Sequence, residues 1–225
     1  MDQNYRPLQD QAYIHLKNLI MNDELEDGVI YSETKMAKEL EISRTPFKAA
    51  LVRLSQDKYI DIIPSKGFKV HVLSEADIES TYQTRTAIEL YCALMIMERR
   101  DTVFAAEALS VMEQTVDAMR SLIQEASDTG EPGAFQEQDR LFHSTLVVYA
   151  ENEEFNRLYE FSIYHQIVTA AKRHKLSKTE KETTCAEHAL ILGAIRNGST
   201  EACCNAVRQH METNKANNLT YLRER

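Results

Sequence analysis

Three histidines and one aspartate in the second half of the chain are the residues whose types and spacing best suit metal binding. Asp139 and His143 are four residues apart, so on a helix both side chains project from one face, and the apolar residues around them predict that this face is buried. His188 and His210 each lie among apolar residues of later, separate segments. Three imidazoles and a carboxylate directed into one interior form the nitrogen and oxygen donor set that suits zinc, nickel or manganese.

Spacing by itself leaves a second interpretation of these histidines open. A single buried histidine is more often a hydrogen-bonded core residue than a metal ligand, and spacing across three segments does not establish that the side chains converge. The Asp-x3-His pair is the only local geometric signal of a metal site.

A set of helices has to bring these donors together, and the sequence after residue 73 shows only helical signals. Ser74 can cap the first of these helices, and acidic residues follow it in the first turn. The expected helices cover residues 74–100, 101–127, 134–150, 152–174, 179–196 and 199–223. We therefore predict an all-α antiparallel helical bundle over residues 74–225, which makes the protein mainly α.

The first 73 residues have a different pattern, in which short helices are followed by short strands. Apolar residues recur at helical spacing in the first part, and β-prone runs surround the turn Pro64-Ser65-Lys66-Gly67. The expected helices cover residues 7–21, 33–40 and 44–58, and the expected strands cover residues 59–63 and 67–72. Three helices and a hairpin, with a tight turn between the second and third helices, predict a winged helix-turn-helix domain over residues 1–73.

Charge within this first domain favours DNA as its partner. The whole chain of 225 residues carries a net charge of -9, but the segment 41–72 contains six basic and three acidic residues. A local basic face on an acidic protein suits DNA, because phosphate contacts need positive charge only where the duplex binds. Basic residues at helical spacing often only cover a solvated face. Here the basic excess coincides with a wing and with a recognition helix that we expect Ser43 to cap, and this combination favours double-stranded DNA.

The predicted DNA contacts follow from how a helix-turn-helix binds the major groove. Residues at the N-terminal end of the second helix of the pair reach base edges, the preceding helix faces phosphates, and the wing tip approaches the minor groove or backbone. The candidates are Ser43, Arg44, Thr45 and Lys48 for bases, Thr34 and Lys35 for phosphates, and Lys66 with Gly67 at the wing. Arg44 can form two hydrogen bonds to guanine.

The run ISRTPFKAALVRLSQDKYIDIIPSKGFKV resembles the signature of the GntR family of bacterial regulators, and YSETKMAKEL is similar to that family's second helix. Lys48 stands where an arginine is usual, Ala49 where a glutamate is usual, and Thr34 where many members carry arginine. Lysine keeps the charge but lacks the planar guanidinium. The resemblance thus implies a DNA-binding regulator with a variant reading helix.

Residues 74–223 resemble the FCD domain of the FadR subgroup of GntR regulators, on the segments YQTRTAIELYCA, FQEQDRLFHSTLV, EHALILGAIRNGS and AVRQHMETN. This resemblance implies that Asp139, His143, His188 and His210 hold one divalent ion, with zinc or nickel favoured over manganese. It implies further that a small carboxylate effector occupies open positions on the ion. Arg85 matches an arginine that faces the effector cavity, although an ion pair with Glu89 is the simpler interpretation.

His165 is a second candidate for lining the effector cavity, or else a packed core residue. The four cysteines show neither a disulfide framework nor the CxxC pairs of a zinc ribbon. The N-terminus is too polar for a secretory signal, and no apolar run is long enough to span a membrane, so we expect a cytoplasmic protein with no membrane partner.

Together these features predict a homodimeric transcription regulator, a repressor, whose operator affinity depends on a small organic acid bound beside a metal. Dimerisation is expected because one winged helix reads a short half-site and two read a palindrome. One alternative is a sensor in which the ion itself is the signal. A metal-dependent enzyme is the other alternative, but no motif places a nucleophile or general base, so we predict no enzyme.

Overall fold

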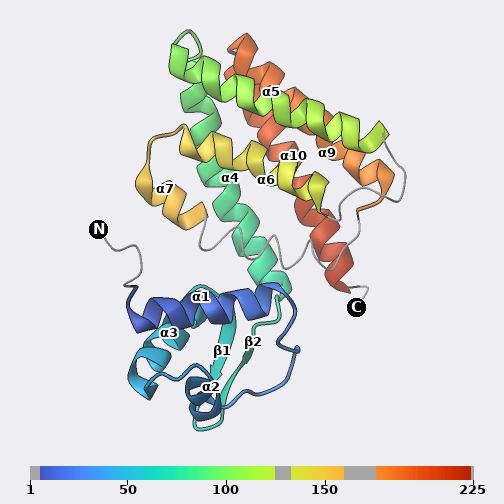
Figure 1. Ribbon diagram of the computed structural model, residues 1–225. Helices are drawn as coiled ribbons and strands as arrows, with labels where there is room; N and C mark the ends of the chain where they lie inside the picture. The colour runs from blue at the N-terminus through green and yellow to red at the C-terminus, as the bar shows by residue number, and fades with distance from the viewer. Residues whose placement is uncertain (1–5, 125–132, 160–175, 224–225) are drawn as a thin grey trace. The chain divides into compact units, whose positions relative to one another are not determined.

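The computed structural model describes residues 6–124, 133–159 and 176–223, and these are mainly helical (Figure 1). The chain divides into two compact units, Met1–Leu73 and Ser74–Arg225. In the described ranges the first unit contains three helices and a small sheet and the second contains only helices, which confirms the predicted fold class. No helix among the described residues is long and apolar enough to cross a membrane.

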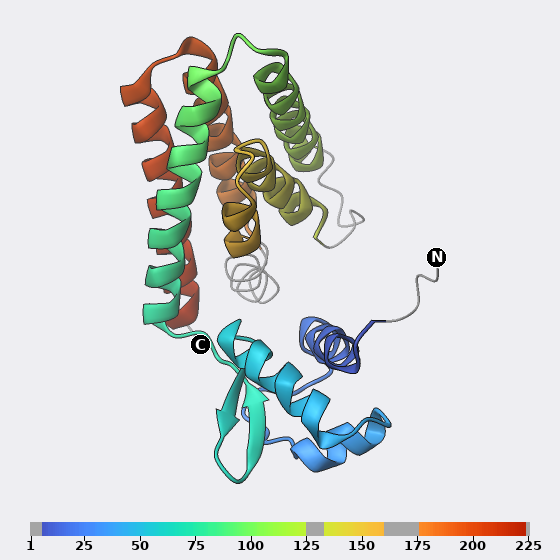
Figure 2. The same cartoon turned by 90° about the vertical axis from the view of Figure 1, so that its left-hand side faces the viewer.

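The first unit is built as a helical core with a β-hairpin. Its elements are α1 (Leu8–Met21), α2 (Glu33–Glu39), α3 (Arg44–Gln56), β1 (Ile60–Ile63) and β2 (Gly67–Val70). β1 pairs antiparallel with β2, with Ile60 opposite Val70, and Tyr31 adds a bridge to Phe68. The apolar stripes of α1 and α3 pack together with the hairpin, and residues such as Leu16, Leu51 and Phe68 are fully buried. The hairpin beside α3 is the wing of a winged helix (Figure 2).

The start of α3 differs from our expectation in one respect. Ser43 occupies the N-cap position with an extended backbone, but its side chain accepts no hydrogen bond from the helix. A capping hydroxyl accepts from the N–H of the second or third helical residue. The third residue here is Pro46, which has no N–H to donate. The Ser43 hydroxyl therefore does not cap α3.

Gly67 has a structural role in the wing. Its φ is +133°, and a Cβ added there would lie 2.0 Å from the carbonyl oxygen of Tyr31. The close approach follows from the bridge in which the N–H of Phe68 donates to that same oxygen. Glycine is the residue that tolerates both this backbone conformation and the close contact.

The second unit is a bundle of helices around one apolar core (Figure 1). Its helices are α4 (Glu75–Glu98), α5 (Val103–Gln124), α6 (Ala134–Val148), α7 (Glu153–Leu158), α9 (Lys178–Asn197) and α10 (Thr200–Arg223). α10 runs antiparallel beside α4, since Arg223 near its end pairs with Glu75 at the start of α4. The helix that we predicted over residues 152–174 is described only in its first part, because residues 160–175 lie outside the described ranges.

Local signals fix where the helices of this unit begin and end. Ser74 and Asp77 form a capping box at the start of α4, as Ser177 and Glu180 do at the start of α9. Gly198, with a φ of +69°, ends α9 and turns the chain into α10. α9 and α10 are thereby held as an antiparallel pair, which matters for the two histidines that they carry.

The geometry at Gly67 generates a stability prediction. Gly67→Ala should lower the free energy of unfolding of the first unit by roughly 2–4 kcal/mol, because the new methyl group clashes with the Tyr31 carbonyl. Gly28→Ala is the matched control, since Gly28 also has positive φ but nothing lies within 4 Å of its added Cβ. That control should cost about 1 kcal/mol. Calorimetry of the full chain measures both, and equal losses would contradict the prediction.

Candidate functional site

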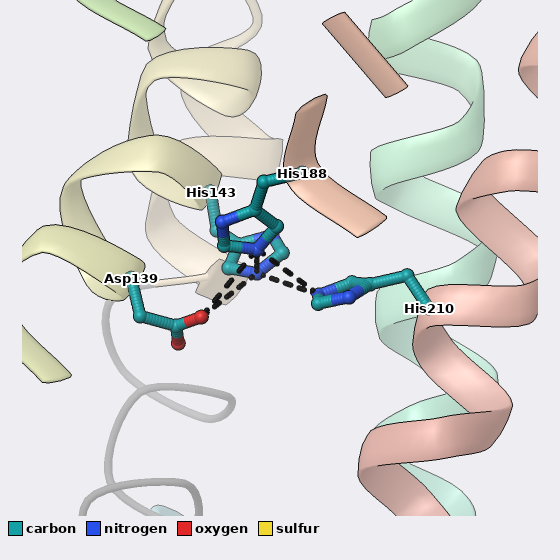
Figure 3. Close-up of side chains that lie close together, drawn as sticks. All are labelled: Asp139, His143, His188 and His210. Carbon is teal, nitrogen blue, oxygen red and sulfur yellow. Dashed lines mark hydrogen bonds and ion pairs between the residues drawn. The ribbon is translucent and has the colours of Figure 1, made fainter. Parts of the chain in front are cut away.

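The structure brings the four predicted metal ligands together inside the second unit (Figure 3). The Nε2 atom of His188 lies 3.2 Å from that of His143 and 3.3 Å from that of His210, and the latter two lie 3.1 Å apart. Asp139 Oδ1 lies 3.4 Å from His188 Nε2 and 3.7 Å from His143 Nε2. One donor atom from each residue thus lies within 4.8 Å of all the others.

Three helices supply these donors from one buried space. Asp139 and His143 project from the inner face of α6, His188 comes from α9 and His210 from α10. The side chains of the three histidines are at most 2% exposed, whereas the side chain of Asp139 is 26% exposed. The carboxylate is therefore the member of the set that solvent reaches.

Two buried carboxylates contact the outward-facing nitrogens of two of these rings. His143 Nδ1 donates to Glu89 Oε2 at 2.6 Å, and His210 Nδ1 donates to Glu187 Oε2 at 2.9 Å. The ring of His188 instead stacks on that of Phe142, with centroids 4.0 Å apart and planes inclined by 4°. Sequence reasoning did not assign Glu89 or Glu187 to the site, although Glu187 directly precedes His188.

Burial and neighbouring charges shift the pKa values of the site in a consistent way. Burial lowers the pKa of His210 to about 3 and that of His188 well below its ordinary value. Burial acts in the same direction on His143, but the Glu89 carboxylate outweighs it and the pKa of His143 is raised. The pKa of Asp139 is lowered, because the surrounding histidines outweigh its own burial.

This arrangement fits a cation. A neutral imidazole carries one N–H, and two of the rings donate theirs from Nδ1 to carboxylates, which leaves their Nε2 lone pairs directed at each other and at Asp139 Oδ1. Acceptors this close in a buried space repel one another unless a proton or a cation lies between them, and the single N–H of a neutral His188 can serve only one of them. Imidazole nitrogen and carboxylate oxygen are ligands that divalent zinc and nickel accept.

Arg85 lies on α4 and is buried next to this group. Its Nε donates to Glu89 Oε1 at 2.8 Å, so the predicted ion pair with Glu89 exists. Its Nη2 is also buried, and among the described residues nothing accepts a hydrogen bond from it. The guanidinium lies over the ring of Tyr82, 5.3 Å from its centroid. The second residue predicted for the effector cavity, His165, is outside the described residues.

Seven of the eight predicted DNA contacts are exposed on the first unit. Ser43, Arg44, Thr45 and Lys48 lie at the N-terminal end of α3, Thr34 and Lys35 lie at the start of α2, and Lys66 lies in the wing turn. Gly67 differs, because it is buried against Tyr31 and presents no surface to a duplex. Its role in the wing is conformational, and Lys66 is the exposed residue of that pair.

Comparison with known proteins assigns each of the two units to a protein family. Residues 80–213 match the FCD domain family, which covers more than half of the chain, and residues 8–70 match the bacterial regulatory proteins of the gntR family. The chain is a GntR family regulator with an FCD domain. Its family and relatives are transcriptional regulators and not enzymes, which confirms that prediction.

Two relatives illustrate the similarity in sequence. An HTH-type transcriptional regulator encoded in the TAR-I ttuE-ttuC′ intergenic region of Agrobacterium vitis is 32% identical over 139 residues, which are 62% of this chain and 78% of that protein. The gluconate operon transcriptional repressor of Bacillus licheniformis is 25% identical over 206 residues, which are 88% of this chain and 79% of that protein.

Solved structures of similar fold cover nearly the whole chain or about two thirds of it. McbR/YncC of E. coli superposes with a TM-score of 0.69 at 17% identity, over 96% of this chain and 99% of that one. The zinc-bound FCD domain of TM0439 superposes with a TM-score of 0.52 at 19% identity, over 67% of this chain and 97% of that one. At identities below 20%, these superpositions show that this GntR regulator has the same fold as the two solved structures.

The exposed end of α3 generates a prediction on DNA binding. Arg44→Ala should weaken binding to an operator, selected with the wild-type protein from random duplexes, by about 1–3 kcal/mol. Loss of a guanine contact accounts for this, and the preference at one base position should relax. Arg120→Ala is the control, since Arg120 is an exposed arginine of α5 that pairs with Asp117. Fluorescence anisotropy measures both, and unchanged affinity in the Arg44 variant would refute its placement at a base.

The packed donor set generates a prediction on stability. Zinc at a hundredfold excess over its dissociation constant should stabilise the second unit by about 2.7 kcal/mol, because the folded chain binds the ion with a preformed set of ligands. The thermal midpoint should rise with zinc concentration and return when a chelator is added. A thermal midpoint that does not change with zinc, nickel or manganese would contradict a metal site.

Proposed function

We propose that this regulator is a repressor of the FadR subgroup whose operator affinity is controlled by a small carboxylate bound near a divalent metal in the FCD domain. The convergence of three imidazole Nε2 atoms and one carboxylate oxygen in a buried space is the observation that carries the proposal. Asp139, His143, His188 and His210 are the proposed ligands, and zinc or nickel suits their nitrogen-rich set better than manganese.

Charge balance supports a divalent ion. Arg85 pairs with Glu89 and neutralises it, and this leaves the carboxylates of Asp139 and Glu187 beside three imidazoles. Buried charges are strongly unfavourable unless they are compensated. A divalent ion at the donor set would compensate these two carboxylates and would replace the proton that the raised pKa of His143 favours in its absence. The FCD domain of TM0439 has been solved in zinc-bound and metal-free forms, which supports a metal role for the same fold here.

Arg85 supports a carboxylate as the effector. Its Nη2 is buried and has no acceptor among the described residues, and a fixed guanidinium binds a carboxylate with two parallel hydrogen bonds. A metal ion at the donor set would supply a second positive centre with positions open to an oxygen ligand. We assign Arg85 to hold and orient the acid, and we retain His165 as a further residue of this cavity.

The first unit supports DNA binding as the function that the effector controls. The protein is proposed to bind a palindromic operator as a homodimer. In each subunit the bases are contacted by Ser43, Arg44, Thr45 and Lys48, and the DNA backbone is contacted by Thr34, Lys35 and Lys66. A relative of similar length is a transcriptional repressor, which supports repression as the direction of control. An effector changes operator affinity only if it binds the DNA-competent and DNA-incompetent forms unequally.

Operator binding with and without metal tests the proposal. The full-length protein is stripped with a chelator, reloaded with zinc or nickel, and titrated onto its operator alone and with a panel of small mono-, di- and hydroxycarboxylic acids. We expect at least one acid to change operator affinity only when metal is present. Operator release on metal removal alone would make the ion the signal, and an acid effect that persists without metal would refute the proposed site.

His210→Ala should reduce the affinity for zinc by at least about 100-fold, because it removes a ligand and leaves the other donors without a complete set. His15→Ala is the matched control, since His15 is exposed on α1 in the other unit. Competition with a chromogenic chelator measures both variants, and similar affinities in the two would contradict the assigned ligand.

A further inference from the structure

We infer that Glu89 and Glu187 are positioning residues that hold His143 and His210 with Nε2 directed at the metal. This inference rests on the proposed metal site and extends it to residues that are not themselves ligands. Both glutamates come from helices different from those of the histidines they contact. Glu89 lies on α4 and faces α6, whereas Glu187 lies on α9 and faces α10.

Glu89 uses both of its oxygens. Oε2 accepts from His143 Nδ1 at 2.6 Å, and Oε1 accepts from Arg85 Nε at 2.8 Å. Its side chain is fully buried, so no exchange with solvent competes with these bonds. Arg85 thus fixes the carboxylate, and the carboxylate fixes the ring of His143.

Glu187 repeats this arrangement on the other side of the site. Oε2 accepts from His210 Nδ1 at 2.9 Å, and Oε1 accepts from the hydroxyl of Thr213 at 2.7 Å. Thr213 follows His210 by three residues on α10, so one face of that helix supplies both the ring and the anchor. Each glutamate therefore places one oxygen on an imidazole and the other on an anchoring donor.

The consequence for metal binding follows from the single proton of a neutral imidazole. A carboxylate at Nδ1 holds the proton there, leaves the Nε2 lone pair for a cation, and makes that nitrogen more basic. His188 is the contrast within the same site. Its Nδ1 is buried and has no partner among the described residues, and its ring is held by stacking on Phe142. Hydrogen bonds thus orient two ligands, and packing orients the third.

The test compares metal binding in the full-length wild type and in three variants, Glu89→Gln, Glu187→Gln and Thr213→Val. Each protein is stripped with a chelator and titrated with zinc or cobalt(II) alone. The two glutamine variants should bind zinc roughly 10- to 100-fold more weakly, because an amide holds the Nδ1 proton less strongly than a carboxylate. Thr213→Val should weaken binding in the same direction, since it frees Glu187 without changing any charge. Glu113→Gln is the control, because Glu113 is an exposed glutamate paired with Arg196.

The visible spectrum of bound cobalt(II) separates positioning from a merely structural role. A glutamate that only stabilises the fold should change the melting temperature of the metal-free protein and leave this spectrum unchanged. We expect the spectrum to change in both glutamine variants and to be unchanged in the control. Should Glu89→Gln fail to fold because Arg85 loses its partner, Glu187→Gln and Thr213→Val test the same inference.

Two negative results are distinguishable. A wild-type protein that binds neither zinc nor cobalt(II) would refute the proposed function and this inference with it. A wild type that binds metal, together with variants of unchanged affinity and unchanged cobalt spectrum, would refute the positioning role alone.

Discussion

Mutual repulsion between electron-rich atoms in a dry space is the constraint on which the second unit depends. Three Nε2 atoms that lie 3.1–3.3 Å apart, with a carboxylate oxygen beside them, cannot be left there without compensation. Dispersion and apolar burial around them favour packing the helices together, but they do not neutralise these atoms. Glu89 and Glu187 hold the protons of two rings on the outward-facing Nδ1 atoms and so leave the Nε2 lone pairs inside, where the positive charge of the proposed ion would relieve the repulsion. Binding of the proposed ion would therefore stabilise the bundle as well as the site.

The helices of this unit can be understood as the framework that the constraint requires. α6 brings Asp139 and His143 to one face, and the turn at Gly198 sets α9 and α10 antiparallel so that His188 and His210 meet. α4 then supplies Glu89 from the opposite side. A one-residue shift of any of these helices would rotate its donor by about 100° away from the centre. The capping boxes and the glycine turn at the helix ends therefore have a direct effect on the chemistry.

Much of the fold and part of the candidate metal site were predictable from sequence, and the features that were not predictable have identifiable physical reasons. Helical spacing, caps and strand patterns predicted the fold, and the Asp-x3-His pair marked the site, because these signals are local. Whether His188 and His210 reach that pair depends on contacts between residues far apart in the chain, which periodicity does not contain. The resemblance to the FCD domain, and not spacing, added these two histidines to the predicted set. Glu187 was missed for the same reason, since its partner is 23 residues away. Ser43 was predicted to cap α3 because of its residue type. Its hydroxyl accepts no hydrogen bond from the helix, and Pro46, the third helical residue, has no N–H to donate.

Polar contacts of α10 connect the donor set with the first turn of α4. Asn214 Nδ2 lies 3.0 Å from His210 Nε2, the nitrogen proposed to bind the metal, so a bound ion would compete with this amide for one lone pair. One turn further on, the Asn218 amide donates to the hydroxyl of Tyr82 on α4, and the pair between Arg223 and Glu75 lies at the first turn of α4. Polar contacts thus continue along α10 and α4 from the donor set to the residues that follow Leu73. Each of these polar pairs requires a specific geometry, so together they fix the position of α10 along α4 more strictly than the apolar contacts between the two helices do.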